Sequence, residues 1–268
     1  MSQLAQRVLT AVPMLVGIVL LLVMAPVGVT ASVLGIVMVL GAWEWAAFIG
    51  WRVPLRRAAY AAASAVVLGL AAWLVPAVVP LEAILWIALC WWLLAFIWIL
   101  RFPTPVPPAA ATLAGILVLV PAWLAIVAIL KVPERGPALV LLALSIVFAA
   151  DIGAYFAGRT LGRRKLAPQV SPGKTWEGVA GGILLAAIVA GAGGAWLGLP
   201  TATMAGVGVG VAALSVVGDL TESMFKRSAG VKDSGNLIPG HGGVLDRLDS
   251  ITAAMPLFAL TLPWLGLS

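Results

Sequence analysis

Hydrophobic residues run along this chain in blocks that prolines, glycines and charged clusters separate. Each block is close to the roughly 20 residues that a helix needs to cross a bilayer. The blocks are apolar throughout and do not alternate, and backbone groups in lipid must bond within their own segment, so helices are favoured over a barrel. We expect helices over 8–25, 29–49, 58–79, 82–100, 110–130, 137–157, 177–197, 200–218 and 248–266.

These windows predict an all-α, polytopic integral membrane bundle of about nine transmembrane helices. Eight is the alternative, because the glycine-rich windows between 177 and 218 can be shortened or tilted. Their glycines, as in "GVAGG", permit close backbone approach, and we expect them to serve helix packing. Of the 268 residues, 63% are hydrophobic and only 10% are charged, too few for the surface of a soluble fold. The first block follows Arg7 and lacks a persuasive cleavage site, so a retained span is expected.

The distribution of Lys and Arg predicts the orientation of the bundle. With the N-terminus in the cytoplasm, fourteen of the 16 Lys and Arg fall on the cytoplasmic side, and only Lys131 and Arg135 fall outside. The net charge of +6 is therefore interpreted as membrane topology, and no nucleic-acid partner is expected. We expect a protein of the inner or plasma membrane. Cys90, the single cysteine, cannot form an intrachain disulfide and is expected to face lipid or to pack.

Acidic residues concentrate in the second half of the chain, where seven of the ten carboxylates lie between Asp151 and Asp249. We therefore divide the chain into a transmembrane scaffold, residues 1–150, and a catalytic transmembrane region, residues 151–268. The catalytic region is expected to carry a cytoplasmic loop over residues 219–249.

Two pairs of acids flank that loop. Asp219 and Glu222 would share one face of a continuing helix, and Asp246 and Asp249 repeat the spacing. An Asp near the bilayer centre costs about 2.5 to 3.5 kcal/mol on insertion scales, so such acids need a compensating partner. Mg²⁺ prefers carboxylate oxygens together with water and phosphate, and we predict these four acids as its ligands.

Basic residues alternate with glycines between the two acid pairs. Lys226, Arg227, Lys232 and Arg247 supply charge for phosphate oxygens, and glycine-rich backbone exposes N–H donors. Acids for a metal and bases for phosphate beside lipid indicate transfer chemistry on a phosphorylated lipid or nucleotide. A merely solvated loop would not explain five acids within residues 219–249. His241, between glycines, is expected to bond or to contact phosphate rather than to act as a general base.

A second polar stretch, "SPGKTWEG" at residues 171–178, invites comparison with a P-loop. The comparison fails, because Pro168 occupies the position of the first glycine and no strand is expected before the helix. Ser171 or Thr175 is then a helix cap, and Lys174 can reach a phosphate. Asp151 lies inside a predicted span among apolar neighbours, which makes it a site candidate.

The run "SMFKRSAGVKDSGNLIPGHGGVLDRLD", Ser223 to Asp249, resembles the signature of phosphatidate cytidylyltransferases, also called CDP-diacylglycerol synthases. "SPGKTWEG" and "DIGAYFAGR" are similar to two further blocks of that family. Gly173 stands where the family commonly has lysine, so one phosphate contact is expected to be missing. The resemblance covers residues 151–250, whereas the first 150 residues resemble the family only as hydrophobic helices.

The resemblance implies Mg²⁺-dependent transfer of CMP from CTP to phosphatidic acid at the cytoplasmic face, giving CDP-diacylglycerol and pyrophosphate. It also implies a second cation, K⁺ or Mg²⁺, and a homodimer in the bilayer. Asp219 and Asp246 are expected to bind metal first, with Asp249 and Glu222 beside them. We expect Asp219, Asp246, Asp249, Lys226 and Lys232 to be catalytic. Substrate contacts are expected from Asp151, Ser171, Lys174, Ser223, Lys226, Arg227, Lys232, His241 and Arg247.

Three alternatives remain open. An ion-coupled transporter or channel would spread its charges over several spans, whereas four of the predicted spans here hold almost none. A CTP-dependent enzyme acting on another lipid, such as an ether-lipid cytidylyltransferase or a polyprenol or phytol kinase, would share much of the polar chemistry. A non-enzymatic scaffold would leave the acid pairs unexplained.

Overall fold

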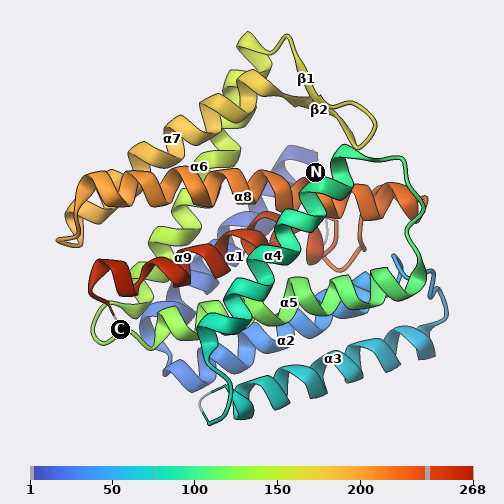
Figure 1. The fold of residues 1–268 in the computed structure, drawn as a ribbon, viewed down its shortest axis with the longest axis horizontal. Coiled ribbons are helices and arrows are strands. Elements are labelled where there is room, and N and C mark those ends of the chain that lie inside the picture. The colour runs from blue at the N-terminus through green and yellow to red at the C-terminus, as the bar shows by residue number, and fades with distance from the viewer. Residues whose placement is uncertain (1–2, 76, 239–241, 268) are drawn as a thin grey trace.

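The computed structural model describes residues 3–75, 77–238 and 242–267, with side chains from residue 12 onward. This part of the chain is almost entirely helical (Figure 1). Its helices are α1 (Gln3–Met24), α2 (Val27–Trp45), α3 (Pro54–Leu74), α4 (Leu81–Leu100), α5 (Pro108–Leu130), α6 (Gly136–Leu161), α7 (Trp176–Trp196), α8 (Thr201–Ser228) and α9 (Leu245–Thr261), followed by the short 3-10 helix η1 (Pro263–Leu265).

Every predicted window coincides with one of these helices, so the polytopic helical class is confirmed. Among the described residues, seven helices, α2 to α8, are long and apolar enough to span a membrane. The apolar part of α1, Val12–Met24, is shorter, and α9 has only 17 residues. The choice between eight and nine spans therefore stays a prediction.

The predicted loop at residues 219–249 is wrong at both ends. Helix α8 continues through Ser228, and α9 already begins at Leu245, so only residues 229–244 connect the two. At about 1.5 Å per residue, the 28 residues of α8 extend roughly 42 Å, beyond the ~30 Å of a bilayer core. The window ended at residue 218 because apolarity ends there, whereas the helix does not.

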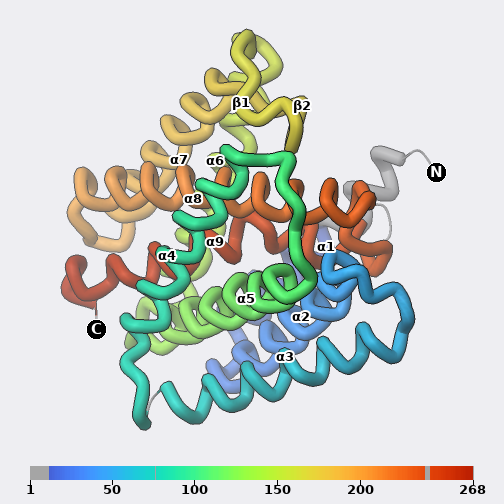
Figure 2. The backbone as a smooth tube through the Cα atoms, turned by 45° about the vertical axis from the view of Figure 1, so that its right-hand side comes forward, coloured from blue at the N-terminus to red at the C-terminus, as the bar shows by residue number. Residues whose placement is uncertain are grey.

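The buried core lies where α5, α8 and α9 pack together, with α2 and α4 against them (Figures 1 and 2). The bulkiest fully buried side chains include Trp45, Trp92, Phe225 and Phe258. They come from both sides of residue 150, so one continuous core joins the proposed scaffold and catalytic regions, and their division stays a prediction. On the outside, α4 exposes large apolar side chains such as Trp86 and Leu93, as suits a lipid-facing helix, and Cys90 is also exposed there.

Helices α6 and α7 pack with almost no space between their backbones. A Cβ added at Gly153 of α6 would lie 2.6 Å from the carbonyl oxygen of Gly181 in α7. A Cβ at Gly181 would in turn lie 3.0 Å from the carbonyl oxygen of Gly153, so the expectation that the glycines of "GVAGG" serve close helix packing is confirmed for Gly181. This contact fixes α6 beside the segment that leads into α7.

A two-stranded antiparallel hairpin, β1 (Lys165–Ala167) and β2 (Ser171–Thr175), joins α6 to α7. The sequence reading placed no strand here, so that argument against a P-loop is wrong, while the mismatch at Pro168 stands. Thr175 caps α7 as expected, because its Oγ1 accepts a hydrogen bond of 3.1 Å from the N–H of Gly178. Ser171 lies at the start of β2 and does not cap the helix.

Candidate active site

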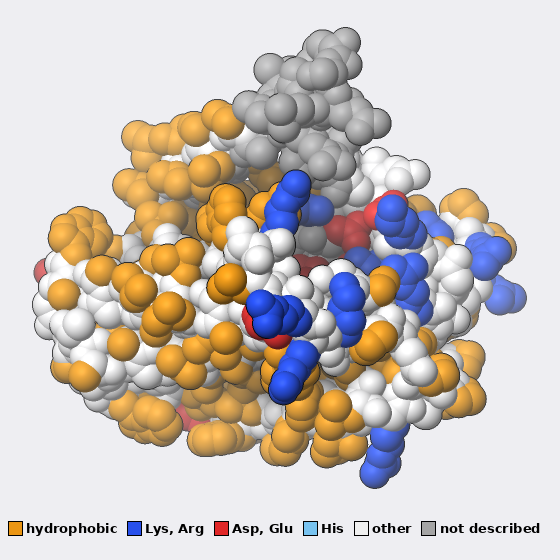
Figure 3. Space-filling model, turned by 90° about the horizontal axis from the view of Figure 1, so that it is seen from above, with side chains coloured by type: hydrophobic (Ala, Val, Ile, Leu, Met, Phe, Trp, Pro, Cys, Tyr) orange, Lys and Arg blue, Asp and Glu red, His pale blue; other side chains and the backbone are white. Residues whose placement is uncertain are grey.

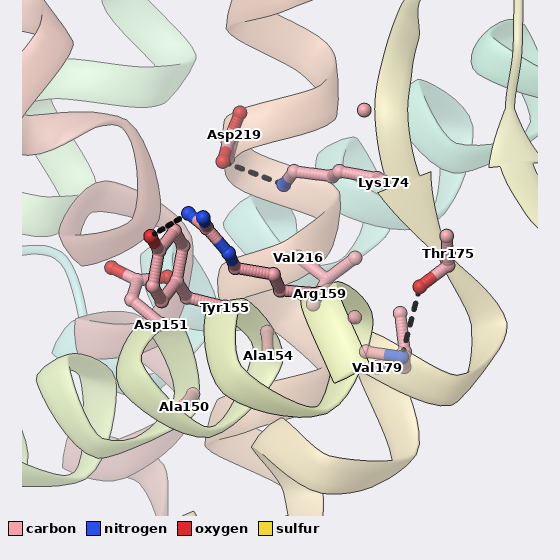
Figure 4. Close-up of a pocket in the computed structure, with 13 residues that line it drawn as sticks. Ala150, Asp151, Ala154, Tyr155, Arg159, Lys174, Thr175, Val179, Val216 and Asp219 are labelled. Atoms are coloured by element: carbon pink, nitrogen blue, oxygen red, sulfur yellow. Dashed lines mark hydrogen bonds and ion pairs between the residues drawn. The ribbon is translucent and has the colours of Figure 1, made fainter. Parts of the chain in front are cut away.

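A cavity of about 530 Å³ opens between α6, β2, α7 and α8 (Figure 4). Asp151, Lys174 and Asp219, each predicted as a site residue, line it together. Ala154, Gly158 and Gly178 form part of its wall, and their small size leaves the room that the polar groups face. The cavity therefore unites one residue from each of the three polar blocks that the sequence analysis singled out.

Lys174 and Asp219 form the central ion pair of this cavity. Lys174 Nζ lies 2.6 Å from Asp219 Oδ2, and the two side chains are 26% and 30% exposed. The hydroxyl of Ser223, one turn along α8, donates to Asp219 Oδ1 at 3.3 Å. Because the pair is partly exposed, an anionic ligand can reach the ammonium and a cation can reach the carboxylate.

Arg159 belongs to the same cavity, although the sequence analysis included it only as the last residue of "DIGAYFAGR" and predicted no role for it. Its Nη1 donates a 2.8 Å hydrogen bond to Tyr155 Oη one turn earlier, with the guanidinium 5.9 Å from that ring's centre. Asp151, Tyr155 and Arg159 follow one another at i, i+4 and i+8, so they share a face of α6. That spacing is the sequence signal that could have identified Arg159.

Helices α8 and α9 cross where Gly218 meets the backbone of Asp249. A Cβ at Gly218 would lie 2.9 Å from that of Ala253, so only glycine permits this approach. The crossing brings acids of both helices into range, and the carboxyl of Asp249 interacts electrostatically with those of Asp219 and Glu222. The helix crossing therefore brings Asp249 near both acids of α8, while the predicted metal site made by all four acids stays a prediction.

Lys226 links α8 to α9 through two acids. Its ammonium lies 2.7 Å from Asp246 Oδ1 and 3.1 Å from Glu222 Oε1. The Lys226 and Glu222 side chains are only 13% and 4% exposed. A buried ammonium between two carboxylates holds α8 and α9 together, and in the structure its charge is already balanced by those acids.

The carboxylate of Asp246 organises the connection before α9. Oδ2 accepts hydrogen bonds from Ser234 N at 3.1 Å, Ser234 Oγ at 3.0 Å and Gly243 N at 2.9 Å. Burial raises the pKa of this carboxyl, but the hydrogen bonds from Lys226 and Gly243 outweigh it and hold the pKa below its ordinary value. Its role as a first metal ligand stays a prediction, and the contacts present are those of a loop-shaping group.

Glu44 reaches the same connection from α2 and was missed in the sequence analysis. It is 1% exposed, and its Oε2 accepts hydrogen bonds from Leu245 N at 2.9 Å and Ser234 Oγ at 3.1 Å. An acid within a predicted span signals a site, and Asp151 was identified on that ground. The same rule applied to "AWEWAAF" would have found Glu44.

The remaining predicted residues do not line the cavity. Arg227 is exposed and its Nε donates to Val170 O at 3.4 Å, which places it beside the hairpin. Lys232 is exposed on the connection, and Arg247, exposed on α9, interacts electrostatically with Asp151. Ser171 is not among the residues that line the cavity. His241 lies outside the described residues.

The acids offer oxygen ligands in pairs rather than in one cluster. Within the described ranges, no group of three or more His, Cys, Asp and Glu is arranged to hold a metal ion. The carboxyls of Asp219 and Asp249 are near enough to interact electrostatically across the helix crossing, and Glu222 Oε1 is buried beside the ammonium of Lys226. Asp219 and Asp151 line the open cavity, and carboxylates there suit Mg²⁺, which takes its other ligands from water and phosphate.

Lys and Arg side chains gather on the face that Figure 3 shows, with acids set deeper in a hollow beside them. An anionic ligand would meet these basic side chains first, and the acids would lie below them.

Comparison with known proteins is consistent with this arrangement. A model of the cytidylyltransferase family matches residues 5–265. The chain is 44% identical over 239 residues to a protein of Pseudomonas aeruginosa named phosphatidate cytidylyltransferase, which covers 87% of both chains. It is 39% identical over 286 residues to a protein of the same name from Haemophilus influenzae, which covers 96% of this chain and 97% of the relative.

Proposed function

Because the chain belongs to the cytidylyltransferase family, we propose that it transfers the cytidylyl group of CTP to phosphatidate. A phosphate oxygen of phosphatidate attacks the α-phosphorus of CTP, the bond to the β-phosphate oxygen breaks, and pyrophosphate leaves. The products are CDP-diacylglycerol and pyrophosphate. The observation that carries this proposal is the cavity in which Lys174 and Asp219 meet beside Asp151 and Arg159.

The proposed reaction needs no activated side chain, because the attacking group is an anion of the lipid itself. The difficulty is to bring two polyanions together, which positioning and charge neutralisation achieve. Lys174 and Arg159 supply cationic donors within the cavity. Lys232 and Arg227 are exposed and would meet the phosphates as they arrive.

In this proposal Asp219 and Asp249 bind Mg²⁺ directly, and Glu222 and Asp246 do not contact the metal. The cation would neutralise phosphate charge and polarise the α-phosphoryl oxygen. Asp246 would act through Lys226 and the connection it shapes, which gives it less direct contact than the sequence analysis expected. A second cation, K⁺ or Mg²⁺, remains part of the proposal through the family resemblance alone.

We place the site on the cytoplasmic side of the inner or plasma membrane. The proposal is supported by the positive-inside rule, since the Lys and Arg of residues 159–174 and 226–247 share the end of the bundle where the cavity opens. A homodimer is proposed from the family resemblance.

One assay tests the activity and the metal assignment together. Purified protein is given labelled CTP, phosphatidate and Mg²⁺, and lipid-soluble label is measured for wild type and Asp219→Asn. We expect label from wild type and a loss of at least about a hundredfold in the variant, roughly 2.7 kcal/mol of barrier. Glu82→Gln, an exposed acid at the start of α4, is the matched control and should match wild type.

Folded wild-type protein that transfers no label to any lipid would overturn the proposed function and favour a transporter. Equal turnover by Asp219→Asn and wild type would remove the metal assignment while leaving the activity in place.

A further inference from the structure

Glu44 is a buried acid of the first half of the chain that contacts the start of α9. It lies in the last turn of α2, and both hydrogen-bond partners of its Oε2, Ser234 and Leu245, are 190 and 201 residues away. A buried carboxyl is costly unless it is hydrogen-bonded. These long-range contacts suggest that Glu44 holds other segments in place.

The first thing held is the beginning of α9. The first N–H groups of a helix have no partner within it, and the N-cap residue Val244 has no side chain that can bond them. Glu44 Oε2 accepts the N–H of Leu245, the first residue of α9, at 2.9 Å. A negatively charged group at this position is also stabilised by the positive end of the helix dipole. Glu44 thus caps α9 from another helix.

The second thing held is the connection before α9. The Ser234 hydroxyl lies 3.1 Å from Glu44 Oε2 and 3.0 Å from Asp246 Oδ2, so it links the two carboxyl groups. Two glycines make room for Glu44 here: an added Cβ would lie 2.6 Å from its Cδ at Gly235 and 2.5 Å from its Oε2 at Gly243. The glycines of this segment accommodate a side chain of α2 as well as any phosphate.

We propose that Glu44 is a positioning residue for the active site. It fixes the start of α9 and the segment around Ser234, so that Asp246 meets Lys226 and Asp249 lies near Asp219. This inference rests on the proposed function for its catalytic consequence. Its structural consequence, an ordered connection, can be measured without any activity.

The test compares Glu44→Ala, Glu44→Gln and the control Glu82→Gln in the full-length protein in detergent. Amide hydrogen exchange of peptides covering residues 230–250 is measured, together with transfer rates at saturating substrates per folded protein. Glu44→Ala should speed exchange in those peptides and lower the rate about a hundredfold, the loss that a ~1 Å misplacement can cause.

Glu44→Gln separates positioning from bulk stability. Its amide oxygen can still accept from Leu245 and Ser234, and its NH₂ group falls where Oε1 has no hydrogen bond among the described atoms. We expect a rate within about tenfold of wild type and slower exchange than in Glu44→Ala. Glu82→Gln should leave both readouts unchanged.

Unchanged exchange, or a Glu44→Ala rate that equals wild type per folded protein, would overturn the inference. If wild type itself transfers no label, the proposed function fails, while the exchange comparison still decides the positioning of α9. Should Glu44→Ala not fold, Ser234→Ala cuts only the link between the carboxyl groups. It should speed exchange and slow transfer about tenfold, and wild-type values in both would equally overturn the inference.

Discussion

Lys174 balances the charge of the cavity at the scale of single residues. It supplies the ammonium that faces Asp219 at 2.6 Å, and it stands at the end of β2 next to the capping Thr175. In the proposed reaction the same ammonium turns to the triphosphate once a cation binds the carboxylate. A partly exposed pair can exchange partners in this way, whereas the buried pair of Lys226 cannot do so without leaving acids uncompensated.

Replacing Lys174 therefore tests whether this residue binds the phosphates of CTP. We expect Lys174→Ala to lower kcat/KM for CTP at least about tenfold through loss of a charge-assisted phosphate contact. The control is Lys131→Ala, an exposed lysine at the opposite end of the bundle, which should retain wild-type kinetics. Steady-state assays with varied CTP make the comparison, and a normal kcat/KM in Lys174→Ala would remove this residue from substrate binding.

The site residues that could be predicted from the sequence are charged residues in apolar segments. Asp151, Lys174 and Asp219 stood out because acids and bases are rare in apolar surroundings, and all three line one cavity. Two of the partners of Asp246 could not be predicted in the same way, since they are the backbone N–H groups of Ser234 and Gly243, 12 and three residues away in an irregular segment. Their positions depend on a fold that no local pattern specifies.

At the scale of elements, the pairing of α6 and α7 places the hairpin over the cavity. Gly153 and Gly181 let the two backbones touch, so the lysine on β2 is held above the acid on α6. Spacing of glycines predicted close packing, but the partner helix was not evident from it. The extension of α8 was also hidden, because its last ten residues combine helix-forming side chains with a polarity typical of loops.

Filling the α6–α7 contact should loosen this part of the molecule. We expect Gly153→Ala to destabilise the protein by about 1–3 kcal/mol, because the new Cβ would lie 2.6 Å from a backbone oxygen. Gly69→Ala in α3 is the control, since nothing lies within 4 Å of its added Cβ. It should be neutral, or stabilising by up to ~1 kcal/mol. Thermal unfolding in detergent distinguishes them, and equal midpoints would show that the helices can separate without cost.

At the scale of the whole molecule, the polar chemistry gathers at one end of the bundle. The ends of α4 and α8 and the start of α5 lie on the right in Figure 1, and the turn between α7 and α8 lies on the left. The distribution of Lys and Arg predicted that this end lies in the cytoplasm, and that orientation stays a prediction. The number of spans was harder to predict, because α9 is largely buried by its neighbours and starts with charged residues.

Cysteine labelling tests the proposed orientation. In a Cys90→Ser background, Lys131→Cys should react with a membrane-impermeant maleimide added outside intact cells, and Arg164→Cys should react only after permeabilisation. Both positions are exposed in the structure, so burial does not confound the result. Labelling of position 164 from outside would place the cavity on the opposite face of the membrane.

The central claim is that this site joins the α-phosphate of CTP to a lipid phosphate. Two parallel reactions with phosphatidate and Mg²⁺, one with CTP labelled at the α-phosphate and one at the γ-phosphate, test it most directly. The account predicts lipid-soluble label from the α position alone, with the γ label released as pyrophosphate. Lipid-soluble γ label would contradict it and identify a CTP-dependent kinase instead.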